Sequence, residues 1–182
     1  AQKTDGSGAV DISVEVDDND DDEVRLKLEY KAGADCSSGT SDPTLDETEG
    51  ATADEGTPDV ENDNEYQVGT ASGIPNVAWN TVQFDWLSAT DVAAADGTYC
   101  IKITPFDAND GAGTAATTTL TLDNVSPTDP GSFSITSSTE TTASLEWTVS
   151  TDTNFDHYEL WYSADEALVT AGLIHLLLPR LL

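Results

Sequence analysis

The chain has 182 residues, of which 35 are Asp or Glu and only six are Lys or Arg, so its formal net charge is −29. This length provides one full domain and part of a second, since domains typically contain roughly 100–150 residues. The negative charge repels a phosphate backbone at long range, which disfavours nucleic-acid binding. No apolar stretch reaches the roughly 20 residues of a membrane-spanning helix, and two histidines and two cysteines limit catalytic and metal chemistry.

A period-two alternation of apolar and polar residues dominates the chain before residue 164 and predicts an all-β protein. Short strands separated by Gly, Asp and Asn turns favour an antiparallel sandwich. Val82, Phe84 and Trp86 are expected to point into its core, because they share one face of a strand. The predicted strands of the first domain are 10–16, 24–30, 81–86, 98–104 and 116–122.

A proline-containing segment at 123–130 ends the last of these strands and marks a predicted domain boundary, since proline cannot donate to a sheet ladder. Three more strands are predicted at 132–136, 143–149 and 157–163. The expected division is a first domain at 1–124 with a long acidic insertion at 37–69, a partial second domain at 125–163, and an aliphatic tail at 164–182.

Two stretches of the second domain, Ser144-Leu145-Glu146-Trp147 and Tyr158-Glu159-Leu160-Trp161-Tyr162, resemble the opening of a fibronectin type III domain. The first domain resembles the immunoglobulin-like repeats of large bacterial cell-surface proteins over 10–16, 24–30, 84–91, 96–100 and 121–127, with the first strand missing or cut short. The resemblance implies an immunoglobulin-like β-sandwich followed by an incomplete fibronectin type III-like sandwich. It also implies spacer, adhesive or scaffold modules without catalysis.

Carboxylates and amides crowd two connections between predicted strands, where a hard cation would relieve their mutual repulsion. Calcium takes six to eight oxygen ligands at flexible geometry, so both connections are candidate calcium sites. A solvated acidic turn is the alternative interpretation, because these residue types favour turns. The candidate ligands are Asp17, Asp18, Asn19, Asp20, Asp21 and Asp22 in the first connection and Asp107, Asn109 and Asp110 in the second. A weaker cluster comprises Asp91 and Asp96.

Cys36 and Cys100 are the only cysteines. A single pair in a β domain predicts a disulfide rather than a metal site, and hence an extracellular or cell-surface location. Two free buried thiols are the alternative. Because Cys100 alternates with Tyr99 and Ile101, which are expected to face the core, its sulfur is expected to point away from the core.

Catalysis is not expected. His157 and His175 are the only histidines, and neither stands in a recognisable nucleophile motif. Trp79 and Trp161 fall outside the predicted core positions, so sugar stacking on them supports an alternative function as a carbohydrate-binding accessory module. Calcium is the one cofactor under consideration.

The tail at 164–182 departs from the fibronectin-like pattern and has three interpretations. It is a segment foreign to the fold, a short helix that caps the sheet, or a strand, 173–178, donated to a neighbouring subunit whose shortened first strand leaves an acceptor edge. The chain also has no methionine, which indicates a processed or excised segment.

The sequence thus predicts a non-catalytic structural or adhesive module, or else a filament subunit assembled by strand donation. The expected partners are neighbouring modules, identical subunits, or a cell-surface protein or glycan.

Overall fold

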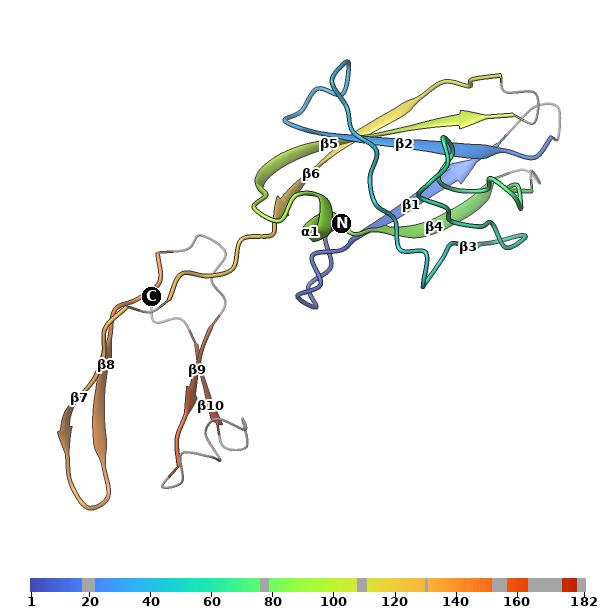
Figure 1. Cartoon of the computed structure of the whole chain (residues 1–182). Helices are drawn as coiled ribbons and strands as arrows, with labels where there is room; N and C mark the ends of the chain where they lie inside the picture. The colour runs from blue at the N-terminus through green and yellow to red at the C-terminus, as the bar shows by residue number, and fades with distance from the viewer. Residues whose placement is uncertain are drawn as a thin grey trace. The chain divides into compact units, whose positions relative to one another are not determined.

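The computed structural model describes residues 1–17, 22–75, 79–107, 111–129, 131–151, 157–163 and 175–179. The chain divides into two compact units, Ala1–Val125 and Ser126–Leu182 (Figure 1). Strands dominate both units, and the one helix among the described residues is the single turn α1, Ser88–Asp91. All strand pairs are antiparallel. The expectation of an antiparallel all-β protein is therefore confirmed.

Two three-stranded sheets make up the first unit (Figure 1). One sheet has the strand order β1-β4-β3 and the other has the order β2-β5-β6, so each sheet contains strands from distant parts of the sequence. The strands are β1 (Val10–Val16), β2 (Arg25–Ala32), β3 (Thr52–Ala53), β4 (Asn80–Trp86), β5 (Asp96–Phe106) and β6 (Ala116–Asp123).

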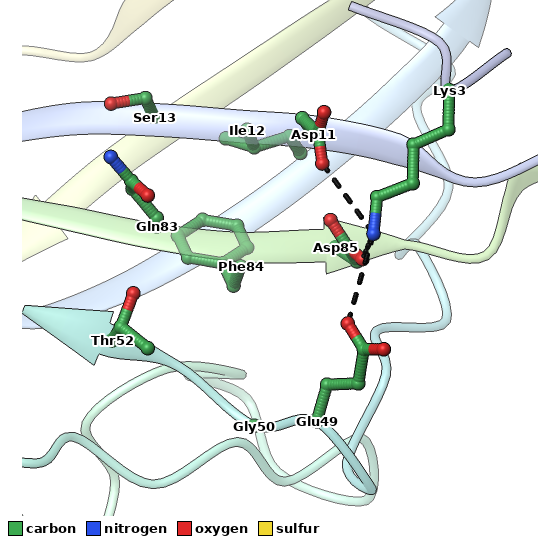
Figure 2. Close-up of a pocket in the computed structure, with 10 residues that line it drawn as sticks. All are labelled: Lys3, Asp11, Ile12, Ser13, Glu49, Gly50, Thr52, Gln83, Phe84 and Asp85. Carbon is green, nitrogen blue, oxygen red and sulfur yellow. Dashed lines mark hydrogen bonds and ion pairs between the residues drawn. The ribbon is translucent and has the colours of Figure 1, made fainter. Parts of the chain in front are cut away.

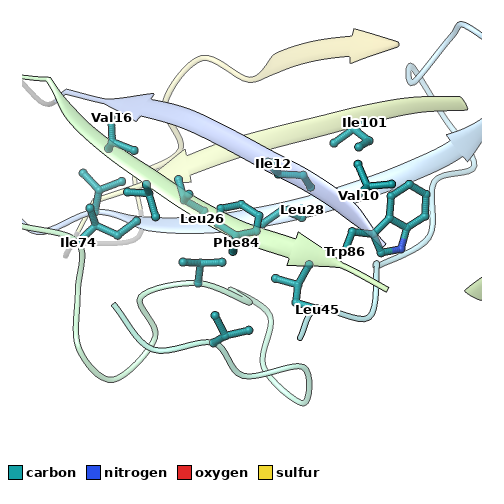
Figure 3. Close-up of a cluster of buried hydrophobic side chains, with 14 of the residues drawn as sticks. Val10, Ile12, Val16, Leu26, Leu28, Leu45, Ile74, Phe84, Trp86 and Ile101 are labelled. Atoms are coloured by element: carbon teal, nitrogen blue, oxygen red, sulfur yellow. The ribbon is translucent and has the colours of Figure 1, made fainter. Parts of the chain in front are cut away.

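The two sheets enclose one hydrophobic core (Figure 3). Val82, Phe84 and Trp86 are all buried, as the alternation of β4 predicts, and Trp86 is fully inaccessible. Alternate residues of β1, the neighbour of β4 in the same sheet, and of β2, in the opposite sheet, complete the core. Burying apolar surface in this way contributes roughly 25 cal/mol per Å² and is the main force that holds the two sheets together.

The acidic insertion at 37–69 packs closely on the first unit. Leu45, Val60 and Val68 from this segment are buried in the core, and β3 pairs with β4. The segment also covers the outer edge of β2, whose backbone groups would otherwise be left without partners. Along that edge the backbone of Leu26 bonds that of Val68, and the backbone of Tyr30 bonds that of Ser41. Just before β2, the backbone of Val24 bonds that of Ile74, which follows the insertion.

Side-chain amides replace missing strand partners at three points of this segment. Gln67 is buried and brackets Leu28: its Oε1 accepts from the Leu28 amide at 2.9 Å, and its Nε2 donates to the Leu28 carbonyl at 3.3 Å. Asn62 makes the same two hydrogen bonds with Leu45: its Oδ1 accepts from the Leu45 amide at 2.7 Å, and its Nδ2 donates to the Leu45 carbonyl at 2.9 Å. Asn80 does the same with Glu55: its Oδ1 accepts from the Glu55 amide at 3.1 Å, and its Nδ2 donates to the Glu55 carbonyl at 2.9 Å. Each amide therefore satisfies one backbone N–H and one C=O of a residue distant in the sequence, and Asn80 also donates to the Pro75 carbonyl at 2.8 Å.

The second unit contains two separate two-stranded ribbons, where the sequence predicts one set of three strands. On the first ribbon Phe133 lies opposite Trp147 and Ile135 lies opposite Leu145, so these four apolar side chains share one face. Phe133 and Ile135 on that face are exposed, and Leu145 and Trp147 are half-buried. The ribbons contact each other where the Trp147 and Tyr158 rings meet edge to face, with centroids 5.6 Å apart. The strands are β7 (Phe133–Ser138) and β8 (Ala143–Trp147) in one ribbon, and β9 (His157–Trp161) and β10 (His175–Pro179) in the other.

The described part of the tail is strand β10, which pairs with β9 of its own chain, His175 opposite Trp161 and Pro179 opposite His157. Its backbone is thus extended and not helical. In the described segments, no helix has both the length and the apolar character needed to cross a membrane.

Candidate functional site

The first predicted calcium site lies mostly outside the described residues. Asp18, Asn19, Asp20 and Asp21 are not described, whereas Asp17 and Asp22 at the two ends of the connection are both exposed. Asn109 and Asp110 of the second predicted site are also outside the described residues. Within the described ranges, no three His, Cys, Asp or Glu side chains are grouped as a metal site would require. Calcium binding stays a prediction.

Asp107 is held by its own turn. Its Oδ1 accepts from the Gly111 amide at 2.9 Å, its amide donates to the Gly111 carbonyl at 3.1 Å, and its carbonyl accepts from Arg25 at 3.2 Å. Arg25 pairs with Phe106, so the start of β2 and the end of β5 lie side by side. The two acidic connections therefore adjoin neighbouring strand ends.

Asp91, in the weaker acidic cluster, has a structural role. Its carboxylate accepts hydrogen bonds from the Thr44 amide at 2.8 Å, the Thr44 hydroxyl at 2.7 Å and the Trp86 indole N–H at 2.6 Å. These donors occupy both carboxylate oxygens and tie the insertion to the core tryptophan. Asp96, by contrast, is exposed at the start of β5.

Cys36 and Cys100 form a disulfide with their Cα atoms 5.7 Å apart. Cys100 lies on the opposite face of β5 from Ile101, yet it is only 2% exposed, and Cys36 is 7% exposed. The expectation of an outward-pointing sulfur therefore describes the strand face correctly but misses the burial of the bridge. The bond fastens the start of the insertion to β5, the central strand of its sheet.

A cluster of charged side chains that the sequence reasoning missed lines a pocket of about 510 Å³ (Figure 2). The Lys3 ammonium binds the Asp85 carboxylate directly and lies 3.6 Å from Asp11 and 3.7 Å from Glu49. Three carboxylates thus share one ammonium. Asp85 lies on the outer face of β4, between core residues, and no spacing in the sequence connects it to Lys3.

The electrostatics of this cluster follow from its geometry. The hydrogen bond to Asp85, with the nearby charges of Glu49 and Asp11, raises the pKa of Lys3. Burial raises the pKa of Asp85, and Asp11 adds to this effect against the opposing influence of Lys3. The cluster holds the N-terminal segment against β4 and the insertion, because each of the three regions supplies one or more of its charges.

The tryptophans differ in their surroundings. Trp79 is 65% exposed and has a φ of +68°, a backbone conformation that bulky side chains seldom adopt. Trp86 is buried in the core, while Trp147 and Trp161 are half-buried. Of the four tryptophans, Trp79 therefore offers the most open ring face.

No family model matches the chain, and no curated protein or solved structure matches it either.

Proposed function

We propose that the chain is a non-catalytic structural module of a cell-surface or extracellular protein, with an immunoglobulin-like β-sandwich followed by fibronectin type III-like strands. The disulfide is the observation that carries this proposal. It closes a loop of sequence separation 64 onto the central strand β5, and it fixes the insertion that covers the β2 edge. Disulfides persist in oxidising compartments, which favours a location outside the cytoplasm.

The charge distribution supports a spacer role. A net charge of −29 keeps neighbouring copies apart and in solution, without creating a binding site for nucleic acid. Much of this charge lies in the insertion, whose apolar residues Leu45, Val60 and Val68 are buried while most of its carboxylates face solvent. The carboxylates of the insertion thus favour solubility, while its apolar residues extend the core.

Single-molecule force spectroscopy tests the proposal. The chain is placed between reference domains of known unfolding force and pulled through its two ends. A load-bearing module is expected to show a distinct unfolding peak for the first unit in every trace and to refold on relaxation. Extension without a resolvable force peak would contradict a load-bearing role.

A carbohydrate-binding role is the second candidate, and the exposed ring of Trp79 is the observation that favours it. Aromatic rings that bind sugars present a flat face to solvent, and strained backbone is often found at ligand sites. A glycan array compares the native chain with Trp79→Ala. Binding that the substitution abolishes would favour this role, whereas a silent array would favour the spacer.

A further inference from the structure

The outer face of the β1-β4-β3 sheet carries a row of three uncharged polar side chains, one from each strand. Ser13 of β1 lies opposite Gln83 of β4, and Gln83 lies opposite Thr52 of β3. All three residues are exposed, because they alternate with residues that face the core. None of their side chains hydrogen-bonds to another residue in the described segments. This polar row therefore has its hydroxyl and amide groups available for a ligand.

The polar row lines the pocket of about 510 Å³ that also holds the charged cluster of Lys3 (Figure 2). This volume falls within the roughly 300–1,000 Å³ of ordinary ligand pockets. The Asp11–Asp85 pair of the cluster lies two residues along the ladder from Ser13 and Gln83, so it is the next row on the same face of the sheet. Of the residues that line the pocket, only Lys3 comes from the segment before β1. The pocket therefore belongs to the sheet face, with the charged cluster at one end and the polar row beside it.

The lining of the pocket disfavours apolar and charged ligands. Ile12 and Phe84 also line it, but they are only 9% and 4% exposed and belong to the core, so the pocket presents little apolar surface. Three carboxylates share one ammonium, so an anionic group would meet a net negative charge. The Lys3 ammonium already lies among these carboxylates, in the place that a ligand cation would take. A neutral ligand with many hydrogen-bonding groups fits this lining best.

Both parts of the lining are suited to hydroxyl groups. The Asp11 and Glu49 side chains are 66% and 68% exposed and lie 3.6 and 3.7 Å from the Lys3 ammonium, so their carboxylates retain free acceptor sites. A hydroxyl group makes a short, strong hydrogen bond to a carboxylate. The Gln83 amide presents an acceptor oxygen beside a donor nitrogen, which together can bind two adjacent hydroxyl groups of one sugar ring. The hydroxyl groups on either side of this amide, in the polar row, can each donate and accept.

We propose that this pocket binds a neutral saccharide, whose hydroxyl groups hydrogen-bond to the polar row and to the carboxylates of Asp11 and Glu49. Side chains directly opposite each other in a sheet are about 5 Å apart, so a saccharide that lies across the three strands meets each member of the row in turn. The inference deepens the carbohydrate-binding candidate and rests on it. It differs in placing the binding groups on the sheet face and not at Trp79.

A glycan array with neutral and uronic-acid oligosaccharides tests the proposal on the full chain. Neutral oligosaccharides are expected to bind, whereas the acidic ones are repelled by the charged cluster. Gln83→Met removes both amide hydrogen bonds at an exposed position and should weaken binding roughly five- to tenfold. Thr52→Val removes one hydroxyl group and should weaken it about threefold. The matched control Thr117→Val, at an exposed position of β6 in the other sheet, should leave affinity within about twofold.

NMR titration of the ¹⁵N-labelled chain with the neutral oligosaccharide that binds most strongly locates the site. The signals of the Gln83 side-chain amide and of the Ser13 and Thr52 backbone amides are expected to shift. Binding that Trp79→Ala abolishes but Gln83→Met leaves intact would overturn this inference and leave the carbohydrate-binding candidate standing. Preferential binding of uronic-acid oligosaccharides would also overturn it. A silent array would overturn the inference and the candidate function together.

Discussion

Gln67 offers the sharpest test of how the insertion is held, because its side chain lies 1% exposed between the insertion and the outer edge of β2. Gln67→Met keeps the length and approximate volume of the side chain but removes both hydrogen bonds to Leu28. The substitution leaves one buried N–H and one buried C=O unsatisfied, each at a cost of about 1–3 kcal/mol. We therefore expect a loss of about 2–6 kcal/mol in the free energy of unfolding.

Such a loss is a large part of the 5–15 kcal/mol that typically stabilises a domain. Urea denaturation monitored by tryptophan fluorescence measures it, since Trp86 is fully buried in the native first unit. Gln83→Met is the matched control, because Gln83 is exposed on β4. The control is expected to change stability by less than about 0.5 kcal/mol. If both variants were equally stable, Gln67 would not function as a strand partner.

Three further predictions concern the disulfide, one ion pair and the acidic connections. Replacing Cys36 and Cys100 by Ala should lower the free energy of unfolding by about 4 kcal/mol through loop-closure entropy, and an unchanged urea midpoint would contradict this. Lys102, followed by Thr40, lowers the pKa of Glu29, so this interaction stabilises the fold above the ordinary glutamate pKa of about 4.3 and is lost as pH falls through the lowered value. Lys102→Gln should thus cost about 1 kcal/mol at pH 7 and less once the pH falls below the lowered pKa of Glu29, and a pH-independent difference would refute the coupling. Calorimetric titration at physiological salt should show calcium binding by the acidic connections, and a silent titration would remove that prediction.

Strand periodicity was sufficient to predict most of the first unit. Where apolar residues alternate strictly, as in β1 and β4, the buried face follows directly from the pattern. Every second side chain is apolar and is buried in the core, so the sequence predicts both the strand and the face that it turns toward the core. The pattern does not reveal the strand order, because pairing joins segments such as β1 and β4 that lie more than 60 residues apart.

The organisation of the insertion could not be predicted from periodicity. It depends on single amides, such as Gln67 and Asn62, that satisfy backbone groups far away in the sequence. Composition gives no sign of such pairing, since an amide in an acidic loop is typical of any solvated turn. The same holds for Lys3 and Asp85, whose contact depends on how the N-terminal segment lies across β4.

The second unit shows a different limit. Its alternating residues predict strands, and strands form, but periodicity does not say which strands share a sheet. Phe133 and Ile135 remain 57% and 64% exposed in a two-stranded ribbon, although their pattern is that of a core-facing strand. An apolar face becomes a core only where another layer covers it.

We propose that the first unit bears load and that its disulfide limits how far the chain extends. The most direct measurement compares the contour length gained on forced unfolding with and without reductant. We expect reduction to add about 230 Å, because the sequence separation of 64 between Cys36 and Cys100 becomes extensible at roughly 3.6 Å per residue. The same gain in both conditions, or the absence of a force peak in either, would contradict a load-bearing first unit held by this disulfide.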